Sequence, residues 1–271
     1  MRHPCERPRQ VENPGASAAP IWADPARAAM PPLCARRRQG YPLLMSLSRP
    51  EIALESARFL ERRLPVAPVA GVPEVRLHRA TPSSGLSRLA NDLPSPYWAY
   101  AWAGGLALAR HILDRPAIVA GRRTLDLGAG SGLVGIAAAK AGASAVIASD
   151  VDPYARAALR LNAAANGVAF AAIVGELTDG PPPEVDVVAV GDLFYEDLLA
   201  SRVAGFLERC VAAGLQVVIG DPWRRFLPRS QLTLLAEYRV ADFGDGSARG
   251  AAASAVFAFA PRPLEKPASL A

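Results

Sequence analysis

The chain of 271 residues has little of what metal sites, disulfide frameworks and membrane spans require. Its three cysteines and three histidines are scattered, without the close spacing of zinc ligands or the regular pairs of a disulfide-rich protein. No apolar run reaches the roughly 20 residues that a membrane helix needs, because Arg, Asp or Gly interrupts even the Ala-rich stretches. We therefore expect no bound metal, no membrane association and a reducing compartment, the cytoplasm.

Lysine is also scarce, at two of the 30 basic residues. Residues 1–44 hold seven arginines against three acidic residues, so they carry +4 of the formal net charge of +5. The rest of the chain is nearly neutral and has no basic stripe, which is unfavourable for binding a polyanion. We expect no nucleic-acid partner, and we expect the protein to be a monomer.

The chain divides by composition into four parts, at 1–44, 45–96, 97–262 and 263–271. The first is rich in Pro and Arg and lacks helical or strand periodicity, which is typical of disorder or of a mis-assigned start upstream of Met45. The second is expected to hold a short helix that begins after Ser48 and ends at Pro65, then a Pro-punctuated connection with an edge strand at Val75–His78. The third has the pattern of a folded domain, and the last is expected to be a flexible tail.

Strands and helices alternate along the third part. Strands are expected at about 124–128, 145–149, 168–174, 185–190, 216–220, 238–243 and 254–260, and helices at about 100–114, 132–141, 153–165, 196–213 and 229–237. Continuous apolar strands between helices indicate an α/β fold of the Rossmann-like, doubly wound type, with a mainly parallel seven-stranded sheet and helices on both faces. The last two strands, joined by the Gly-rich loop 244–250, predict a C-terminal antiparallel hairpin.

The most informative segment is the turn after the first of these strands, Leu125-Asp-Leu-Gly-Ala-Gly-Ser-Gly132. Glycines at alternate positions let the backbone approach a ligand closely, and the helix that follows directs its N-terminal amides at that ligand. Asp126 adds a negative charge, which would repel a pyrophosphate and attract the amino and sulfonium groups of S-adenosylmethionine. The turn therefore favours a methyl-donor site.

Other functions stay open on these residues. Gly130-Ser-Gly-Leu-Val-Gly135 also matches the dinucleotide fingerprint G-x-G-x-x-G, and Asp150 could hold a ribose in either case. A nicotinamide-dependent oxidoreductase is therefore one alternative. A small-molecule N-methyltransferase and a non-catalytic protein that binds the donor are two others.

Ligands of such sheets bind outside the carboxyl ends of the strands, so the loops there supply the candidates for donor contacts. These candidates are Asp126, Gly128, Ala129, Gly130, Gly132, Asp150, Val151, Glu176 and Gly191. Asp150 is expected to accept both ribose hydroxyls, with its neighbour Asp152 as the cap of the next helix. Glu176 is expected to contact the adenine amino group.

The acceptor side is expected at the loop Gly191-Asp-Leu-Phe-Tyr195. Asp192 would hold a substrate ammonium, and the aromatic side chains of Phe194, Tyr195 and Trp98 would border it. Trp98 and Trp102, four residues apart, are expected on one helical face, and Asp221, Trp223 and Arg224 would line a second substrate loop. Because the loop lacks Asn/Asp-Pro-Pro-Tyr, an amide or a base amino group is disfavoured as the acceptor.

Six motifs together resemble one family. They are Val72-Pro-Glu-Val-Arg-Leu-His78, Pro96-Tyr-Trp-Ala-Tyr-Ala-Trp-Ala-Gly-Gly105, Leu125–Gly132, Leu161-Asn-Ala-Ala-Ala-Asn-Gly167, Gly191–Tyr195 and Gly220-Asp-Pro-Trp-Arg224. In combination, over about Pro50 to Arg262, they resemble the class I (seven-strand) methyltransferases of the electron-transfer-flavoprotein β-subunit lysine methyltransferase group. Bacterial members of this group are often labelled nicotinamide N-methylase-like.

The resemblance implies S-adenosylmethionine as the methyl donor and a protein lysine as the acceptor, on the electron-transfer-flavoprotein β-subunit or on a ribosomal protein. It implies donor contacts from Asp126, Gly128, Gly130, Asp150 and Glu176, and acceptor contacts from Trp98, Asp192, Phe194 and Tyr195. The chain departs from the family at Trp223, where Gly is frequent, and at Glu176, where many relatives carry Asp. A tryptophan at position 223 is expected to reshape the groove for a protein substrate.

Overall fold

The computed structural model describes residues 58, 60–81, 84, 86, 96–240 and 252–260. The predicted extension 1–44, the predicted helix start after Ser48, the loop 244–250 and the tail 263–271 lie outside the described residues. Of the predicted N-terminal helix, residues 60–63 are described and helical, and Leu60 and Leu64 are buried.

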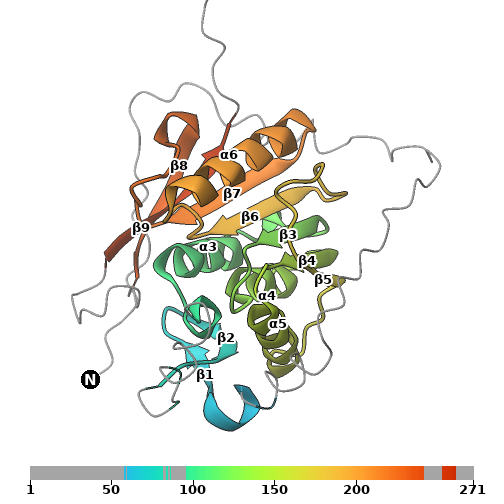
Figure 1. Cartoon of the computed structure of the whole chain (residues 1–271), viewed down its shortest axis with the longest axis vertical. Coiled ribbons are helices and arrows are strands. Elements are labelled where there is room, and N and C mark those ends of the chain that lie inside the picture. The colour runs from blue at the N-terminus through green and yellow to red at the C-terminus, as the bar shows by residue number, and fades with distance from the viewer. Residues whose placement is uncertain are drawn as a thin grey trace, which may run out of the picture.

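The main sheet has seven strands, which confirms the predicted fold class (Figure 1). They are β3 (Arg123–Leu127), β4 (Ala145–Ser149), β5 (Ala172–Val174), β6 (Val187–Gly191), β7 (Gln216–Asp221), β8 (Leu232–Val240) and β9 (Ala252–Phe259). Their order in the sheet is β5-β4-β3-β6-β7-β9-β8. The first five of that order are parallel, whereas β9 runs antiparallel to both β7 and β8. The predicted C-terminal antiparallel hairpin is therefore also confirmed.

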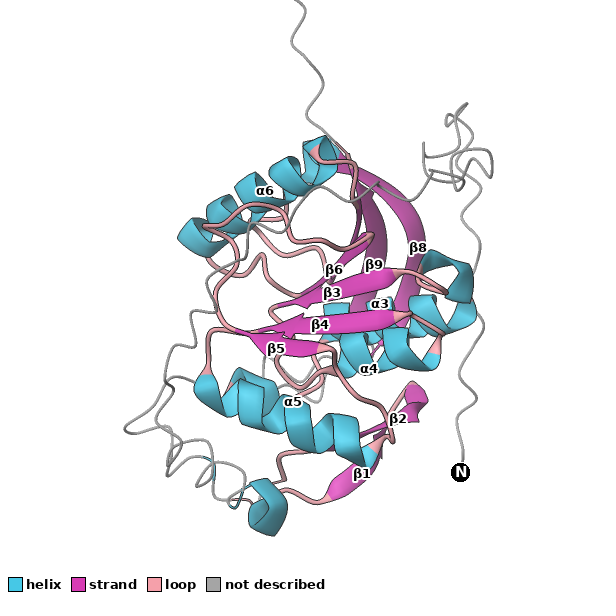
Figure 2. Ribbon diagram, turned by 90° about the vertical axis from the view of Figure 1, so that its right-hand side faces the viewer, coloured by secondary structure: helices cyan, strands magenta, loops and turns pink. Residues whose placement is uncertain are grey.

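Helices cover both faces of the sheet, as predicted (Figure 2). On one face lie α3 (Ala103–Asp114), α4 (Leu133–Lys140) and α5 (Pro153–Ala165), and on the other lies α6 (Asp197–Ala212). Successive residues of a strand point to opposite faces. Val188 accordingly packs into the cluster that contains Phe206 of α6, while Val187 packs into the cluster that contains Leu108 of α3.

The start of α3 contacts the end of β7 through backbone alone. A Cβ atom on Gly104 would collide with the carbonyl oxygen of Gly220, and a Cβ atom on Gly220 would collide with that of Gly104. Only glycine permits so close an approach at both positions. This contact brings the N-terminus of α3 to the carboxyl ends of β6 and β7, where ligands of such sheets bind.

A separate two-stranded antiparallel sheet, β1 (Val66–Val69) and β2 (Val72–His78), packs against α4 and α5. The predicted strand at Val75–His78 is real, but it belongs to this small sheet and not to the edge of the main one. Asn162 in α5 accepts the backbone amide of His78 at 2.8 Å and donates to the carbonyl of Ser131, in the glycine-rich turn, at 2.8 Å. The small sheet is therefore tied to that turn through one side chain.

Two element predictions were wrong. The predicted helix at 229–237 is a 3-10 turn at Arg229–Gln231 followed by strand β8. Leu, Ala and Glu favour a helix there, but pairing with β9 along the whole strand outweighs that preference. The predicted strand at 168–174 is shorter, since only Ala172–Val174 pairs with β4.

Within the described part of the chain, no helix has both the length and the apolar character needed to cross a membrane. The same residues contain no group of three or more His, Cys, Asp or Glu side chains that could hold a metal ion.

Candidate functional site

The sheet order reverses between β3 and β6, and the loops that follow the strands on either side of this point lie at one rim. Leu127 is in register with Ser149 of β4 and with Val190 of β6, and Gly191 is in register with Gly220 of β7. The four strands therefore end level with one another. The structure brings together the glycine-rich turn, Asp150, the loop from Asp192 and the loop from Asp221.

The glycine-rich turn has a backbone that requires glycine. Gly128, Gly130 and Gly132 have φ angles of 66°, 51° and 83°, in the left-handed region. A Cβ atom on Gly128 would collide with the Leu193 side chain, whereas on Gly130 it would meet nothing closer than the Trp98 Cα atom at 3.8 Å. A Cβ atom on Gly130 would thus make only ordinary contacts, and the left-handed backbone of the turn fits a ligand that lies close to it, as S-adenosylmethionine would.

Asp150 lies beside this turn. Its Oδ2 atom accepts the Gly130 amide at 2.8 Å, and its Oδ1 atom accepts the Asp152 amide at 2.9 Å. Asp152 caps α5 by accepting the Tyr154 amide at 2.8 Å, which confirms the predicted cap. Burial raises the pKa of Asp150 above its ordinary value. The role of Asp150 toward a ribose stays a prediction, and its place beside Gly130 is compatible with it.

The charge argument for Asp126 was wrong in its physical basis. Asp126 is buried, and its Oδ2 atom accepts the amide of Gly135, in α4, at 2.7 Å. Because the carboxyl is buried it does not lie at the mouth of a site, and burial also raises its pKa to about 7. A Cβ atom on Gly135 would lie 3.0 Å from that oxygen. Sequence reasoning used Gly135 only as part of a fingerprint, but its role here is to let α4 approach β3. Contact between Asp126 and a donor stays a prediction.

Three other predicted donor contacts occupy different positions around the turn. Ala129 is buried, and its amide donates to the Ser149 carbonyl at 2.9 Å. Val151 is exposed at the end of β4. Gly191 lies against α3, since a Cβ atom there would be 3.1 Å from the Gly105 Cα atom. Contacts of all three with a donor stay predictions.

Asp192 joins three segments of the chain. It adopts a φ of 60°, unusual for a residue other than glycine, and is only 7% exposed. Its Oδ2 atom accepts the Gly105 amide at 2.8 Å, and its Oδ1 atom accepts Arg224 Nη2 at 2.7 Å. The predicted contact with a substrate ammonium stays a prediction. In the structure, the Asp192 carboxylate holds the start of α3 and the loop after β7.

An aromatic group forms the exposed rim beside Asp192. The rings of Tyr97 and Tyr195 lie 5.7 Å apart, and Trp102 lies 5.5 Å from Tyr97 and 5.8 Å from Tyr100. Tyr97 is 50% exposed and Tyr195 is 46% exposed. Burial of the rest of the ring, with Tyr97 and Asp150 close by, raises the pKa of Tyr195. Sequence reasoning singled out the tryptophans of this motif and missed Tyr97.

Two predictions on aromatic residues were wrong. Phe194 is fully buried in the core cluster that faces α6, so it cannot border an acceptor. Trp98 and Trp102 do not share a helical face, because Trp98 lies in a 3-10 turn and Trp102 is the N-cap of α3 with extended backbone. Trp98 is buried and stacks on Tyr154, at 6.3 Å between ring centroids.

The loop after β7 is held by buried groups. Asp221 is fully buried, and its Oδ1 atom accepts the Arg224 amide at 2.6 Å. Burial raises the pKa of Asp221 to about 7, with the nearby Asp192 adding to the shift, and its Oδ2 atom has no hydrogen-bond partner among the described residues. Trp223 has a φ of 66°, and its ring packs edge-on against Phe257 at 4.8 Å. Trp223 therefore packs inward against the core.

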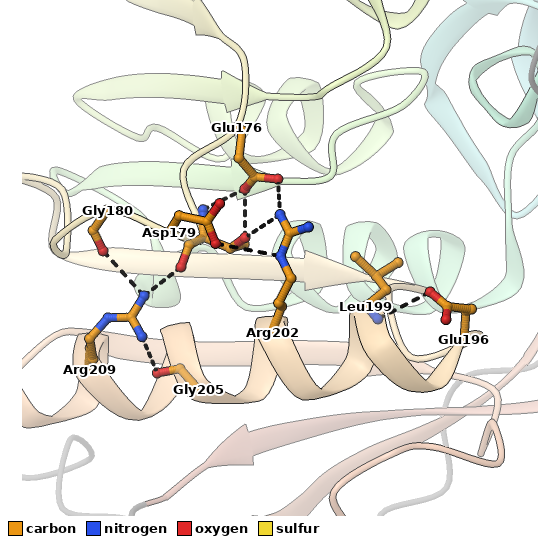
Figure 3. A network of polar contacts seen from close by, with 9 residues as sticks. Glu176, Asp179, Gly180, Glu196, Leu199, Arg202, Gly205 and Arg209 are labelled. Atoms are coloured by element: carbon orange, nitrogen blue, oxygen red, sulfur yellow. Dashed lines mark hydrogen bonds and ion pairs between the residues drawn. The ribbon is translucent and has the colours of Figure 1, made fainter.

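Glu176 lies in the loop after β5 and faces α6 (Figure 3). Its Oε1 atom accepts the amide and the hydroxyl of Thr178, both at 2.6 Å, and its Oε2 atom pairs with Arg202. Burial alone would raise the pKa of Glu176, but the Thr178 hydrogen bonds and the Arg202 guanidinium outweigh it and lower the pKa. Contact between Glu176 and an adenine stays a prediction.

Comparison with known proteins places this geometry in a family. The family model of ribosomal protein L11 methyltransferase (PrmA) matches residues 108–196. The electron transfer flavoprotein beta subunit lysine methyltransferase of Rattus norvegicus is 39% identical over 198 residues, which are 70% of this chain and 78% of the rat protein. The chain belongs to the family of electron transfer flavoprotein beta subunit lysine methyltransferases. The human member is 35% identical over 217 residues, 76% of this chain and 83% of the human protein.

A solved structure with the same kind of fold is the ribosomal protein L11 methylase of Lactobacillus delbrueckii subsp. bulgaricus. It is 21% identical, with a TM-score of 0.40, and the match covers 57% of this chain and 77% of that one. Family membership makes the protein a methyltransferase. None of these relatives supports the oxidoreductase alternative.

Proposed function

We propose that this protein transfers a methyl group from S-adenosylmethionine to lysine side chains of a protein, with the electron-transfer-flavoprotein β-subunit as the first candidate acceptor. The observation that carries the proposal is the 39% identity to the rat lysine methyltransferase over 78% of that protein. A ribosomal protein is the second candidate, because the matching family model is named for the methylation of one.

The donor would lie along the glycine-rich turn. When bound, it would supply the methyl group from its positively charged sulfur: the sulfur–methyl bond breaks as the nitrogen–methyl bond forms, and neutral S-adenosylhomocysteine leaves. Asp150 would accept the ribose hydroxyls with the lone pairs that its bonds to Gly130 and Asp152 leave free. Glu176 would accept the adenine amino group, and the exposed Val151 would pack on the base. The left-handed backbone at Gly128, Gly130 and Gly132, which lets a ligand approach closely, supports this placement.

The acceptor lysine would enter across Tyr97, Trp102 and Tyr195. Their rings would pack on its alkyl chain, and partial removal of the amine from water would lower its pKa, which favours the neutral nucleophile. Holding that amine in line with the methyl carbon, at about 3 Å, contributes much of the rate. The proton that the nitrogen loses can leave to solvent, since Tyr97 and Tyr195 are each about half exposed.

An open rim supports a protein acceptor over a small molecule. A closed pocket for a metabolite would need Trp98, Trp102 and Trp223 to converge, but Trp98 packs on Tyr154 and Trp223 packs on Phe257. Beside the rim, Leu198 in the first turn of α6 is 76% exposed. Leu198, together with the half-exposed Tyr97 and Tyr195, would offer apolar contacts to a protein that docks at this rim.

The test is transfer of a tritiated methyl group into a lysate of the same organism prepared from a strain without this gene, and into its purified electron-transfer flavoprotein. We expect one labelled protein, with the label recovered as methyl-lysine after hydrolysis. An Asp150→Ala variant should label nothing, and an Arg239→Met variant, changed on an exposed side chain of the edge strand β8, should label normally.

Other outcomes select the alternatives. Label found only in small molecules would overturn the protein acceptor and leave a metabolite N-methyltransferase. Binding of S-adenosylhomocysteine without any transfer would leave a non-catalytic donor-binding protein. The cytoplasm and the monomeric state, also part of the proposal, are tested by fractionation and by sedimentation.

A further inference from the structure

Helix α6 holds the loop that follows β5 through two arginines (Figure 3). Arg202 and Arg209 are seven residues apart, which is about two helical turns, so both point from one face of α6 toward residues 176–180. Arg209 bonds only backbone carbonyl oxygens, those of Thr178, Gly180 and Gly205. Arg202, in contrast, reaches side chains of the loop.

The contacts of Arg202 converge on Glu176. One nitrogen, Nη2, pairs with Glu176 Oε2 and also donates to Thr178 Oγ1 at 3.1 Å. Its Nε atom lies 3.6 Å from Asp179 Oδ1. Thr178 donates to the other oxygen of Glu176 from both its amide and its hydroxyl. The carboxylate is therefore held from two sides.

This arrangement has little to do with stability. The side chains of Arg202 and Glu176 are 48% and 37% exposed, and ion pairs so accessible to water contribute little to folding. What the contacts do is restrict Glu176, whose three side-chain torsions would otherwise be free, and lower the pKa of its carboxyl. A carboxylate fixed in this way is ready to accept a hydrogen bond without further loss of conformational freedom.

We propose that Arg202 is a positioning residue for the methyl donor: it orients the Glu176 carboxylate toward the 6-amino group of the adenine. The proposal rests on the proposed function, in which Glu176 borders that base. Arg202 itself touches no part of the donor and acts through Glu176. It thereby makes the site specific for adenine over bases that lack the amino group.

The experiment measures binding of two ligands by calorimetry: S-adenosylhomocysteine and its analogue with hydrogen in place of the 6-amino group. The wild type should bind the analogue about tenfold more weakly or worse, as the loss of a hydrogen bond to a charged group predicts. Arg202→Met should weaken the binding of S-adenosylhomocysteine by a similar factor and leave the binding of the analogue unchanged. The ratio of the two dissociation constants should therefore approach one. Arg209→Met, which disturbs the same loop without touching Glu176, should keep the wild-type ratio.

Each other result overturns something definite. If Arg202→Met keeps the ratio, or if Arg209→Met loses it as fully, Arg202 does not act through the orientation of Glu176. If the wild type binds both ligands equally, Glu176 does not bind the 6-amino group and the proposal for Arg202 is wrong. The proposed methyl transfer is not affected by that result. If the wild type binds neither ligand, the proposed function itself fails. Should Arg202→Met not fold, Arg202→Gln gives the same comparison with a shorter change.

Discussion

The guanidinium of Arg224 donates two hydrogen bonds to one oxygen of Asp192, with Nη2 at 2.7 Å and Nε at 3.1 Å from Oδ1. These bonds join the loop after β7 to the loop after β6. The acid is buried and the arginine is 23% exposed. Breaking a buried pair leaves a charge without its partner, which costs more than the pair contributes when intact.

We expect Arg224→Met to lower the free energy of unfolding by about 2–4 kcal/mol, less than for a fully buried pair because solvent reaches the guanidinium. The double variant Asp192→Asn/Arg224→Met should be less destabilised than the sum of the single variants, by about 1–3 kcal/mol. Urea unfolding measures all three. Arg225→Met, which removes a neighbouring arginine that lies only over the Phe226 ring, serves as the control and should be close to neutral. Simple additivity of the single variants would contradict the coupling.

Asn162→Ala should affect both stability and donor binding. The change leaves the His78 amide and the Ser131 carbonyl without their partner, and we expect a loss of about 2–4 kcal/mol for two such groups. Because Ser131 belongs to the glycine-rich turn, S-adenosylhomocysteine should also bind several-fold more weakly. Asn166→Ala is the matched control: it removes bonds to the more exposed backbone of Arg76 and one to the Asn162 carbonyl, but leaves the Asn162 side chain on Ser131, so donor affinity should be unchanged. Equal effects of the two variants on binding would sink the proposed link to the turn.

The stability of the fold should fall as the pH rises through the range where Asp221 titrates. Its pKa is raised from 3.8 to about 7 in the folded state, so the folded state favours the protonated acid. The quantity that changes is the free-energy cost of ionising Asp221 in the folded protein. This cost is absent below pH 3.8, grows between pH 3.8 and about 7, and is constant above that, with an upper limit of about 4 kcal/mol.

Asp221→Asn cannot titrate, so its stability relative to the wild type should increase with pH across that window. Urea unfolding at pH 5 and pH 8 compares the two, and a fixed cost of the amide cancels in the difference. Asp126 has a similarly raised pKa but is present in both proteins, so its contribution cancels as well. A difference between the two proteins that does not change with pH would contradict the assignment to Asp221.

Trp223 provides a test of backbone strain. At a φ of 66° a non-glycine residue costs about 1 kcal/mol or more, so Trp223→Gly should be more stable than Trp223→Ala by roughly that amount, the reverse of the usual order. Both should be less stable than the wild type, because each loses the edge-on contact with Phe257. Thermal unfolding of the pair gives the order directly. If the alanine variant is the more stable, the left-handed backbone does not persist in solution.

Much of the fold follows from local patterns in the sequence. The apolar strands β3, β4, β6 and β7, the glycine-rich turn and the Asp152 cap are encoded by neighbouring residues, and each lies close to where the sequence predicts it. Strand β8 does not, because its sequence favours a helix and only the pairing with β9 makes it a strand. The small sheet was only half predicted for the same reason, since β1 pairs with β2 without a strong pattern of its own.

Side-chain directions at the site were harder to predict. The motif Gly191–Tyr195 identifies the right loop, but the positive φ of Asp192 sets where the following residues point, and Phe194 enters the core while Tyr195 stays at the rim. The sequence suggests that Asp126 is an exposed acid. It is buried because Gly135 lets α4 pack close to β3 and donates its amide to the carboxyl. Asn162 was noted within a motif, yet its role depends on His78, 84 residues away.

The backbone contact between Gly104 and Gly220 limits how the proposed acceptor site can change. With no side chain on either residue, the distance between α3 and β7 cannot be adjusted by a conservative substitution, and any added atom would push the helix away from the sheet. The amide of Gly105 would then leave Asp192. A change of acceptor preference, whether evolved or engineered, is therefore expected at outer residues such as Tyr97 and Leu198. The contact between Gly104 and Gly220 and the bond from Gly105 to Asp192 would stay the same.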